Sequence, residues 1–310
     1  MITLSNGHKF KYMVASGALA FDGLGWFWER LLVWLGLIKP ELFTVVLKTL
    51  TLEPLKGNLC WWKPWTWLPF SPWSCVRFIP GGTVNKVGLT NRGFNWWCEE
   101  VMPEIDFDRY SIVVSIFGKG WECVQMAKRL NRYEIVAIEV NVSCPNSGDA
   151  LKDAKFVVDT IKAVAVESRH PVIVKVSVGQ DYLAIAEGLK GVAQAISLNS
   201  VPWKIAFPNG EITPLRKLEA RVGGGGGGVS GKPAQKKNWE AVEALARQGA
   251  LPVIAPSIME FADLARVDKL GASAYSFGAI HCKSPVEPTK IVMSQMCDQL
   301  MTASRERNKL

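Results

Sequence analysis

Polar side chains interrupt four apolar segments that have the composition of buried strands, and each lies near the carboxyl end of its segment. The four are Lys48 in "FTVVLK", Asn141 in "IVAIEVNV", Lys175 in "PVIVKV" and Asn199 in "AISLN". Because side chains alternate between the two faces of a strand, each shares a face with a small or polar neighbour: Thr44, Glu139, Ser177 and Ser197. Burying two lysines costs several kcal/mol unless hydrogen-bonding or anionic groups meet them. The pattern favours a site for an anionic ligand over the alternative, a purely structural pair of Lys175 with Glu139.

A cysteine follows the second of these segments, in "NVSCPNSG" (141–148). The thiol of Cys144 could act as a base if a nearby cation lowered its pKa. Pro145 fixes the turn, and Asn146 adds a donor and an acceptor. No pair of cysteines has C-x-x-C spacing, and none of the three histidines has a partner motif. We therefore expect neither a metal site nor a Ser–His–Asp site.

Eight short β-rich segments recur along the chain, mostly with helical stretches between them. They span residues 11–16, 42–49, 110–118, 134–143, 171–178, 194–200, 251–257 and 272–280. Eight repeats without a second zone of composition predict a (β/α)8 TIM barrel in a single domain, residues 1–310; a doubly wound open sheet is the alternative. Because active sites of such barrels lie at the carboxyl ends of the strands, the polar strand ends should meet at one mouth.

Inserted segments are expected to cover this carboxyl face of the barrel. Two inserts rich in tryptophan span about 19–40 and 53–109, and a long loop spans 201–237. The loop contains six consecutive glycines in "RVGGGGGGVSGKP" (221–233). Such a run is too flexible for the interior of a helix or strand, so a plain linker is one interpretation. Ser230 and Gly231, directly before a helix, indicate an anion site instead.

The composition excludes some partners. The 310 residues are 48% hydrophobic and carry a formal net charge of +8, which allows a sizeable core and suits an anionic ligand or surface. The sequence has no basic stripe interleaved with aromatic residues and no nucleic-acid motif, so no nucleic acid is expected as a partner. Seven cysteines, an odd number, and no signal peptide favour reduced thiols and a cytoplasmic location.

Tryptophan is the unusual residue, with 13 occurrences. Most lie in two clusters, residues 25–38 and 60–73, and the first is too short and too charged to span a bilayer. Three interpretations stay open: the clusters form the core of a lid over the barrel, which is the favoured one, they form a homodimer interface, or they contact an anionic membrane face peripherally and admit a quinone.

Several motifs together resemble the dihydroorotate dehydrogenase family. Beside "NVSCPNSG", they are "VASGAL" (14–19), "VVLKTLTLEPLKGN" (45–58), "NKVGLTNRGFN" (85–95), "VIVKVS" (172–177), "SLNS" (197–200), "GGVSGKP" (227–233) and "SFGAI" (276–280). They follow the family's order and spacing from about residue 11 to residue 288. The resemblance implies a barrel that binds FMN and oxidises dihydroorotate to orotate in pyrimidine biosynthesis. A cysteine base is similar to that of the soluble class rather than the membrane-linked class, which uses serine.

The resemblance also implies roles for individual residues. Cys144 would take the C5 proton while hydride leaves C6 for flavin N5. Orotate would be held by Lys48, Asn85, Asn141, Asn146, Asn199 and Ser200, with the backbone of Val87, Gly88 and Leu89. FMN would be lined by Ala15, Ser16, Gly17, Lys48, Thr49, Ser115 and Asn141, with Lys175 at the flavin ring. Its phosphate would be bound by Ser230, Gly231, Ser257, Gly278 and Ala279.

The sequence departs from the family's pattern after the seventh and eighth strands. Pro256 and Ser257 replace a usual glycine pair, and Ala279 replaces a usual threonine. Proline has no N–H to donate, so one phosphate contact is expected to be lost unless the Ser257 hydroxyl replaces it. Alternative functions are oxidation of another dihydropyrimidine and a non-catalytic flavin-binding barrel. The sequence leaves the electron acceptor open among fumarate, a quinone and a partner flavoprotein.

Overall fold

The computed structural model describes residues 1–59, 74–143 and 153–307. Eight parallel strands form a closed barrel in which β14 pairs back onto β3. In order around the barrel they are β3 (Tyr12–Val14), β4 (Thr44–Val46), β7 (Ser111–Ile116), β8 (Ala137–Asn141), β9 (Val172–Val176), β10 (Ala195–Leu198), β13 (Val253–Ala255) and β14 (Ala274–Phe277). Each lies inside one of the eight segments expected from the sequence. The (β/α)8 barrel prediction is therefore confirmed, and the open-sheet alternative is wrong.

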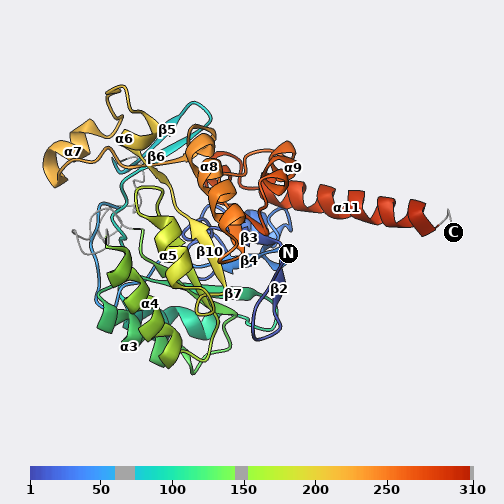
Figure 1. Ribbon diagram of the computed structural model, residues 1–310, viewed down its shortest axis with the longest axis horizontal. Coiled ribbons are helices and arrows are strands. Elements are labelled where there is room, and N and C mark those ends of the chain that lie inside the picture. Colours follow the sequence, from blue (N-terminus) through green and yellow to red (C-terminus); the bar gives the residue numbers. More distant parts are fainter. Residues whose placement is uncertain (60–73, 144–152, 308–310) are drawn as a thin grey trace.

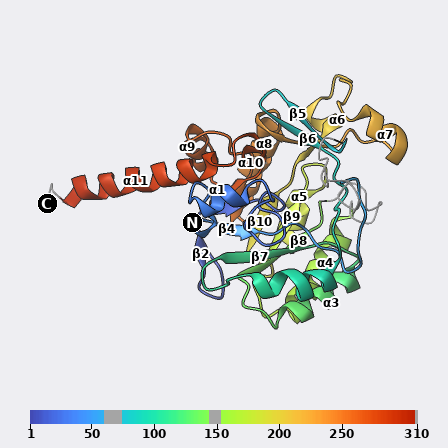
Figure 2. The same cartoon turned by 180° about the vertical axis from the view of Figure 1, so that it is seen from behind.

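Helices surround the barrel (Figures 1 and 2). The longer ones are α3 (Gly120–Leu130), α4 (Ala154–Glu167), α8 (Lys232–Gln248), α9 (Ala262–Lys269) and α11 (Glu287–Arg307). The shorter ones are α1 (Arg30–Trp34), α2 (Phe94–Trp96), α5 (Tyr182–Gly188), α6 (Trp203–Ala206), α7 (Arg216–Val222) and α10 (Ala279–Lys283). In α4, Val157, Ile161 and Val164 are fully buried. Their helical spacing gives one apolar face that packs against the strands.

The amino-terminal end of the barrel is closed by a hairpin, β1 (Ile2–Thr3) and β2 (Lys9–Phe10). Its apolar side chains form one buried cluster with strand residues that include Val46, Ala137 and Ile173. By strand alternation these point the same way as Lys48, Glu139 and Lys175. The strand face that carries Lys48, Glu139 and Lys175 therefore points into the barrel, as expected. This face is apolar at the amino-terminal end of the barrel and polar at the carboxyl end.

A second sheet, called the upper sheet here, lies at the carboxyl face of the barrel. Its order is β11 (Val201–Pro202), β12 (Gly228–Gly231), β6 (Gly82–Asn85) and β5 (Val76–Ile79), and every pairing is antiparallel. Two strands come from the 53–109 insert and two from the loop after β10. Both inserts therefore cover the mouth together, as the sequence predicts, although it gave no sign of their pairing.

The first tryptophan cluster is divided between the core and the surface. Trp26 packs on the core, stacks on Trp28, and donates its indole N–H to the carbonyl oxygen of Gly17 at 3.1 Å. By contrast, Trp34 is 80% exposed and Leu31 is 61% exposed. The lid interpretation thus holds for the part near Trp26. The second cluster, residues 60–73, lies outside the described residues, and the homodimer and membrane interpretations stay predictions.

The glycine run is held in place rather than left as a plain linker. Lys86 donates to the carbonyl oxygens of Gly223 and Gly224, and Gly228 is the first residue of β12. Gly226 has a φ of 78°, and a Cβ built on it would lie 2.2 Å from the Cβ of Trp203. Because Gly226 has no side chain, the backbone can pass directly against Trp203.

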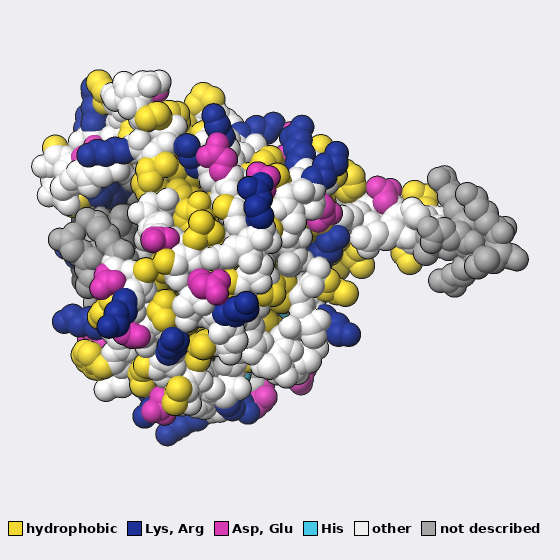
Figure 3. All heavy atoms as spheres, viewed as in Figure 1, with side chains coloured by type: hydrophobic (Ala, Val, Ile, Leu, Met, Phe, Trp, Pro, Cys, Tyr) yellow, Lys and Arg dark blue, Asp and Glu magenta, His cyan; other side chains and the backbone are white. Residues whose placement is uncertain are grey.

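The C-terminal helix α11 starts against the body and then projects from it (Figures 1 and 2). Ile291 and Val292 are buried, and Gln295 accepts a hydrogen bond of 2.8 Å from the Tyr12 hydroxyl. Figure 3 shows Lys and Arg side chains interspersed with acidic and hydrophobic ones over the described residues of one face. No helix in the described part of the chain combines the length and the apolarity needed to cross a bilayer.

We predict that Gly226→Ala lowers the free energy of unfolding by about 2 kcal/mol, because the added methyl group overlaps Trp203 and the positive φ disfavours a side chain. Gly224→Ala is the matched control, since a Cβ there would meet nothing within 4 Å. Thermal denaturation of both variants checks this. Equal shifts in the two melting temperatures would contradict a packed glycine run.

Candidate active site

A cavity of about 810 Å³ lies at the carboxyl ends of the strands, beneath the upper sheet. It is lined by eighteen of the residues predicted to bind substrate or flavin: Ala15, Ser16, Gly17, Lys48, Thr49, Asn85, Val87, Gly88, Leu89, Asn141, Lys175, Asn199, Ser200, Ser230, Gly231, Ser257, Gly278 and Ala279. The barrel thus brings residues from most of the chain together. The volume is in the upper part of the range for cavities that hold small molecules and cofactors.

Of the predicted site residues that the structure describes, Ser115 does not line the cavity. Ser115 in β7 is fully buried and lies behind Thr49, with 2.9 Å between the two hydroxyl oxygens. Cys144 and Asn146 lie outside the described residues, so their roles stay predictions. Ser143, the last described residue before them, does line the cavity.

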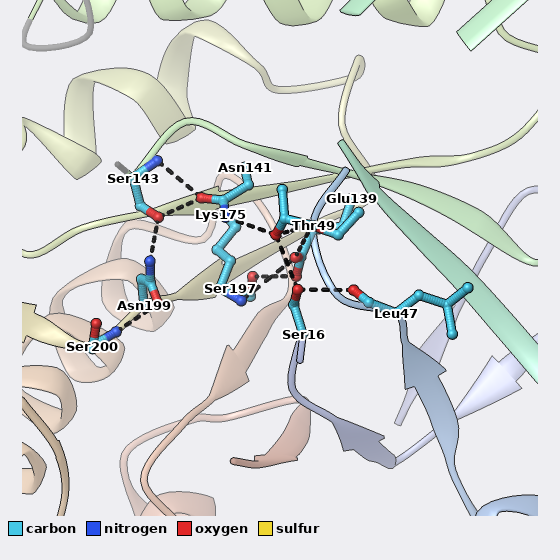
Figure 4. Close-up of polar contacts among 11 residues, drawn as sticks. Ser16, Leu47, Thr49, Glu139, Asn141, Ser143, Lys175, Ser197, Asn199 and Ser200 are labelled. Carbon is cyan, nitrogen blue, oxygen red and sulfur yellow. Dashed lines mark hydrogen bonds and ion pairs between the residues drawn. The ribbon is translucent and has the colours of Figure 1, made fainter. Parts of the chain in front are cut away.

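A buried hydrogen-bond network centred on Glu139 lies next to the cavity, which its member Lys175 lines (Figure 4). One carboxylate oxygen of Glu139 accepts from the Ser115 hydroxyl at 2.9 Å, and the other accepts from the Ser197 hydroxyl at 3.3 Å. Lys175 Nζ lies 3.5 Å from the first oxygen, with both side chains buried. The pair that the sequence analysis treated as the less favoured alternative is therefore present. Lys175 also lines the cavity, so the pair and a ligand contact are compatible.

Side-chain amides continue this network toward the mouth (Figure 4). Asn141 donates to the Thr49 hydroxyl at 3.2 Å, and its carbonyl oxygen accepts from the Ser143 hydroxyl at 2.5 Å. Asn199 in turn donates to the Ser143 oxygen at 2.6 Å and accepts from the Ser200 backbone N–H at 2.8 Å. Each amide is therefore held in one orientation, as recognition of a ligand with fixed donors and acceptors requires.

Lys48 is buried two residues after the end of β4, with only 7% of its surface exposed. Among the described residues no carboxylate forms an ion pair with it, and its ammonium lies 5.6 Å from the ring centre of Phe21. Burial lowers the pKa of Lys48 to about 8. A buried cation that lacks a counterion and faces a cavity favours an anionic ligand.

The end of the cavity near β12, β13 and β14 has tight backbone turns. Gly231 has a φ of 88°, and a Cβ there would lie 2.6 Å from the Gly81 carbonyl oxygen. Ser257 has a φ of 65°, a conformation that is costly for a residue with a side chain. Its hydroxyl accepts a hydrogen bond of 3.2 Å from Asn238. Ser257 therefore holds a backbone conformation that glycine would adopt without strain.

Sequence reasoning missed Glu29, which is buried against the same cavity. Its carboxylate accepts from the Trp26 backbone N–H at 2.8 Å, and burial raises its pKa to about 7. The only available signal was a single acidic residue within an apolar stretch.

Asn238 and His281 were also missed. Both are buried and line the cavity. Among the described residues the buried side-chain polar atoms without a hydrogen-bond partner are Asn238 Oδ1 and both ring nitrogens of His281. Neither residue belongs to a recognisable sequence motif, so only the fold reveals them.

We predict that Glu139→Gln lowers the free energy of unfolding by roughly 3 kcal/mol, because it leaves Lys175 buried without its counter-charge. Adding Lys175→Met should restore much of this loss. As a control, Glu243→Gln removes the partner of Arg247 in an exposed pair and should cost less than about 0.5 kcal/mol. Urea denaturation of the unmodified protein, the two single variants, the double variant and the Glu243→Gln control measures the coupling. Purely additive losses in the double variant would contradict an energetically coupled pair.

Comparison with known proteins agrees with this geometry. The family model for dihydroorotate dehydrogenase matches residues 72–300. Similar curated proteins are named dihydroorotate dehydrogenase B (NAD(+)), catalytic subunit. The one from Desulforamulus reducens is 29% identical over 261 residues, which cover 81% of this chain and 80% of the relative. The one from Bacteroides thetaiotaomicron is 28% identical over 257 residues, covering 80% and 78%.

The family match covers more than half of the chain. It includes the upper sheet, the Glu139 network and the strand ends that carry Asn141, Lys175 and Asn199. The chain therefore belongs to the dihydroorotate dehydrogenase family and is an oxidoreductase of that kind.

Proposed function

We propose that this protein oxidises dihydroorotate to orotate with FMN, a step of pyrimidine biosynthesis. The observation that carries the proposal is the convergence of Lys48, Asn141 and Asn199 in one cavity at the strand ends. Dihydroorotate has one carboxylate and a ring with amide donors and acceptors. A buried cation next to two oriented side-chain amides suits both features.

The cavity also fits a flavin. Ala15, Ser16 and Gly17 follow β3 on one side, and Ser230 with Gly231 precedes α8 on the other. The backbone at Gly231 passes where a Cβ would collide, and two buried side chains present unsatisfied polar atoms. When bound, FMN supplies the hydride acceptor. Lys175 would hold positive charge near the flavin ring, with Glu139 fixing its position.

In the proposed reaction Lys48 binds the substrate carboxylate, and Asn141 and Asn199 hold the ring. Cys144, as thiolate, takes the proton from C5 while the hydride leaves C6, so that a C5–C6 double bond forms and orotate results. Ser143 precedes Cys144 and is hydrogen-bonded to both amides. This arrangement supports delivery of the base to the same side of the cavity as the substrate-binding amides.

The relatives' names favour one of the three electron acceptors left open. Both name NAD(+) and describe a catalytic subunit. By analogy, we propose that electrons leave this chain through a partner flavoprotein rather than directly to fumarate or a quinone.

Binding of orotate should weaken as the pH rises through about 8, because Lys48 loses its proton there. Above that pKa the dissociation constant should rise by up to roughly tenfold per pH unit. In the unfolded chain Lys48 keeps its proton to higher pH than in the folded protein. As the pH rises above about 8, this difference increases the stability of the folded protein. Unfolding therefore does not explain the loss of orotate binding. Calorimetric titration between about pH 7 and pH 9 measures it. Lys48→Met should bind weakly with a flatter profile; an unchanged slope in this variant would refute the assignment.

Cys144→Ala should keep FMN but lose turnover of dihydroorotate by roughly a hundredfold or more, as expected for removal of a general base. Steady-state assays with an artificial electron-accepting dye, together with the flavin content of each preparation, test this. Cys297→Ala, on the exposed part of α11, is the control and should retain normal rates. Full activity of Cys144→Ala would remove Cys144 from the mechanism.

A further inference from the structure

Two buried side chains at the β13–β14 end of the cavity carry polar atoms that a ligand could satisfy. Asn238 and His281 are 1% and 2% exposed. In the described part of the chain they hold all the buried side-chain polar atoms that lack a partner. Leaving such a group unsatisfied costs about 1–3 kcal/mol each. Both line the cavity, so a ligand there can recover this cost.

The ring of His281 is placed toward the turn that follows β14. His281 is the third residue of α10, and its backbone N–H already donates to the Gly278 carbonyl oxygen at 3.0 Å. Side chains on a helix lean toward its amino-terminal end, which here begins at Ala279. The helix α10 packs beside β12, the strand that carries Ser230 and Gly231. His281 therefore lines the same cavity as Ser230, Gly231 and Gly278, on a helix that packs beside β12.

Asn238 reaches the same region from α8. Its amide nitrogen donates to the Ser257 hydroxyl at 3.2 Å, and Gln235 on the same helix donates to the Ser257 carbonyl oxygen at 3.0 Å. Rotating the amide by half a turn lets the Ser257 hydroxyl donate to Oδ1 and leaves the NH₂ group free to donate to a ligand. Asn238 can thus offer a donor without losing its contact to Ser257.

The lysines that line the cavity are engaged elsewhere, which leaves His281 for this role. In the described part of the cavity they are Lys48, Lys86 and Lys175. Lys86 donates to glycine carbonyl oxygens and Lys175 pairs with Glu139, while Lys48 belongs to the proposed substrate end. Burial lowers the pKa of His281 to about 4, and a bound dianion would favour its protonated form.

We propose that His281, together with Asn238, binds the phosphate of FMN and supplies a contact that Pro256, lacking an N–H, cannot. The inference rests on the proposed function. In this chain, side chains would bind the phosphate at a position where Pro256 offers no backbone N–H. His281 is a phosphate-binding residue on this account and takes no part in proton transfer to the substrate.

The test compares affinities for FMN and riboflavin, which differ only in the phosphate, by calorimetric titration of flavin-free protein. His281→Gln should weaken FMN binding roughly tenfold to hundredfold and leave riboflavin binding unchanged. Asn238→Asp, which keeps the side-chain shape and adds a negative charge, should also weaken FMN selectively. His170→Gln is the control, because His170 is a buried histidine whose ring Nε2–H donates to the Leu130 carbonyl oxygen at 3.0 Å, and it does not line the cavity.

The possible outcomes distinguish failure of the phosphate site from failure of the proposed function. A fall in the ratio of FMN to riboflavin affinity in both variants, with no change in His170→Gln, supports the phosphate site. An unchanged ratio in His281→Gln and Asn238→Asp overturns it while leaving flavin binding intact. Failure of the unmodified protein to bind either flavin would overturn the proposed function and the phosphate site together.

Discussion

The burial of charge at one end of the barrel is the constraint on which the structure depends. Lys48, Glu139 and Lys175 project into a space that apolar side chains fill at the other end. Glu139 is stabilised there because hydroxyl groups from β7 and β10 and the ammonium from β9 all meet its two oxygens. Removing one partner leaves a buried charge, which is far more costly than loss of a surface pair. The strands must therefore keep one register for the network to form.

The two ends of the barrel have different roles: the amino end stabilises the fold, and the carboxyl end carries the candidate active site. At the amino end the hairpin β1–β2 seals an apolar cluster. At the carboxyl end the upper sheet and Trp26 cover a cavity into which polar strand ends such as Lys48, Asn141 and Lys175 project. Partial exclusion of water strengthens each electrostatic contact inside. Loss of water around its ammonium lowers the pKa of Lys48, and an anionic ligand would supply the counter-charge that no carboxylate of the described residues gives.

The barrel could be predicted because its signal is local. Apolar segments with polar carboxyl ends, such as those ending at Asn141 and Asn199, fix strand direction and the inward face without knowledge of the rest. The upper sheet could not be predicted, since β6 pairs with β12 across more than a hundred residues and glycines carry no side-chain pattern. The roles of Asn238 and His281 depend on burial and on missing partners, which exist only in three dimensions. At Ser257 the sequence alone predicted a departure from the family's pattern. The structure adds that this residue has a positive φ, which is unfavourable for a residue with a side chain.

The account rests on one claim, that the cavity holds a flavin which dihydroorotate can reduce. The most direct measurement is the visible absorption spectrum of the purified protein, supplemented with FMN, before and after anaerobic addition of dihydroorotate. The account predicts a flavin spectrum that bleaches in proportion to the substrate added. A flavin that stays oxidised after dihydroorotate is added, or a protein that remains colourless after FMN is supplied, would contradict it.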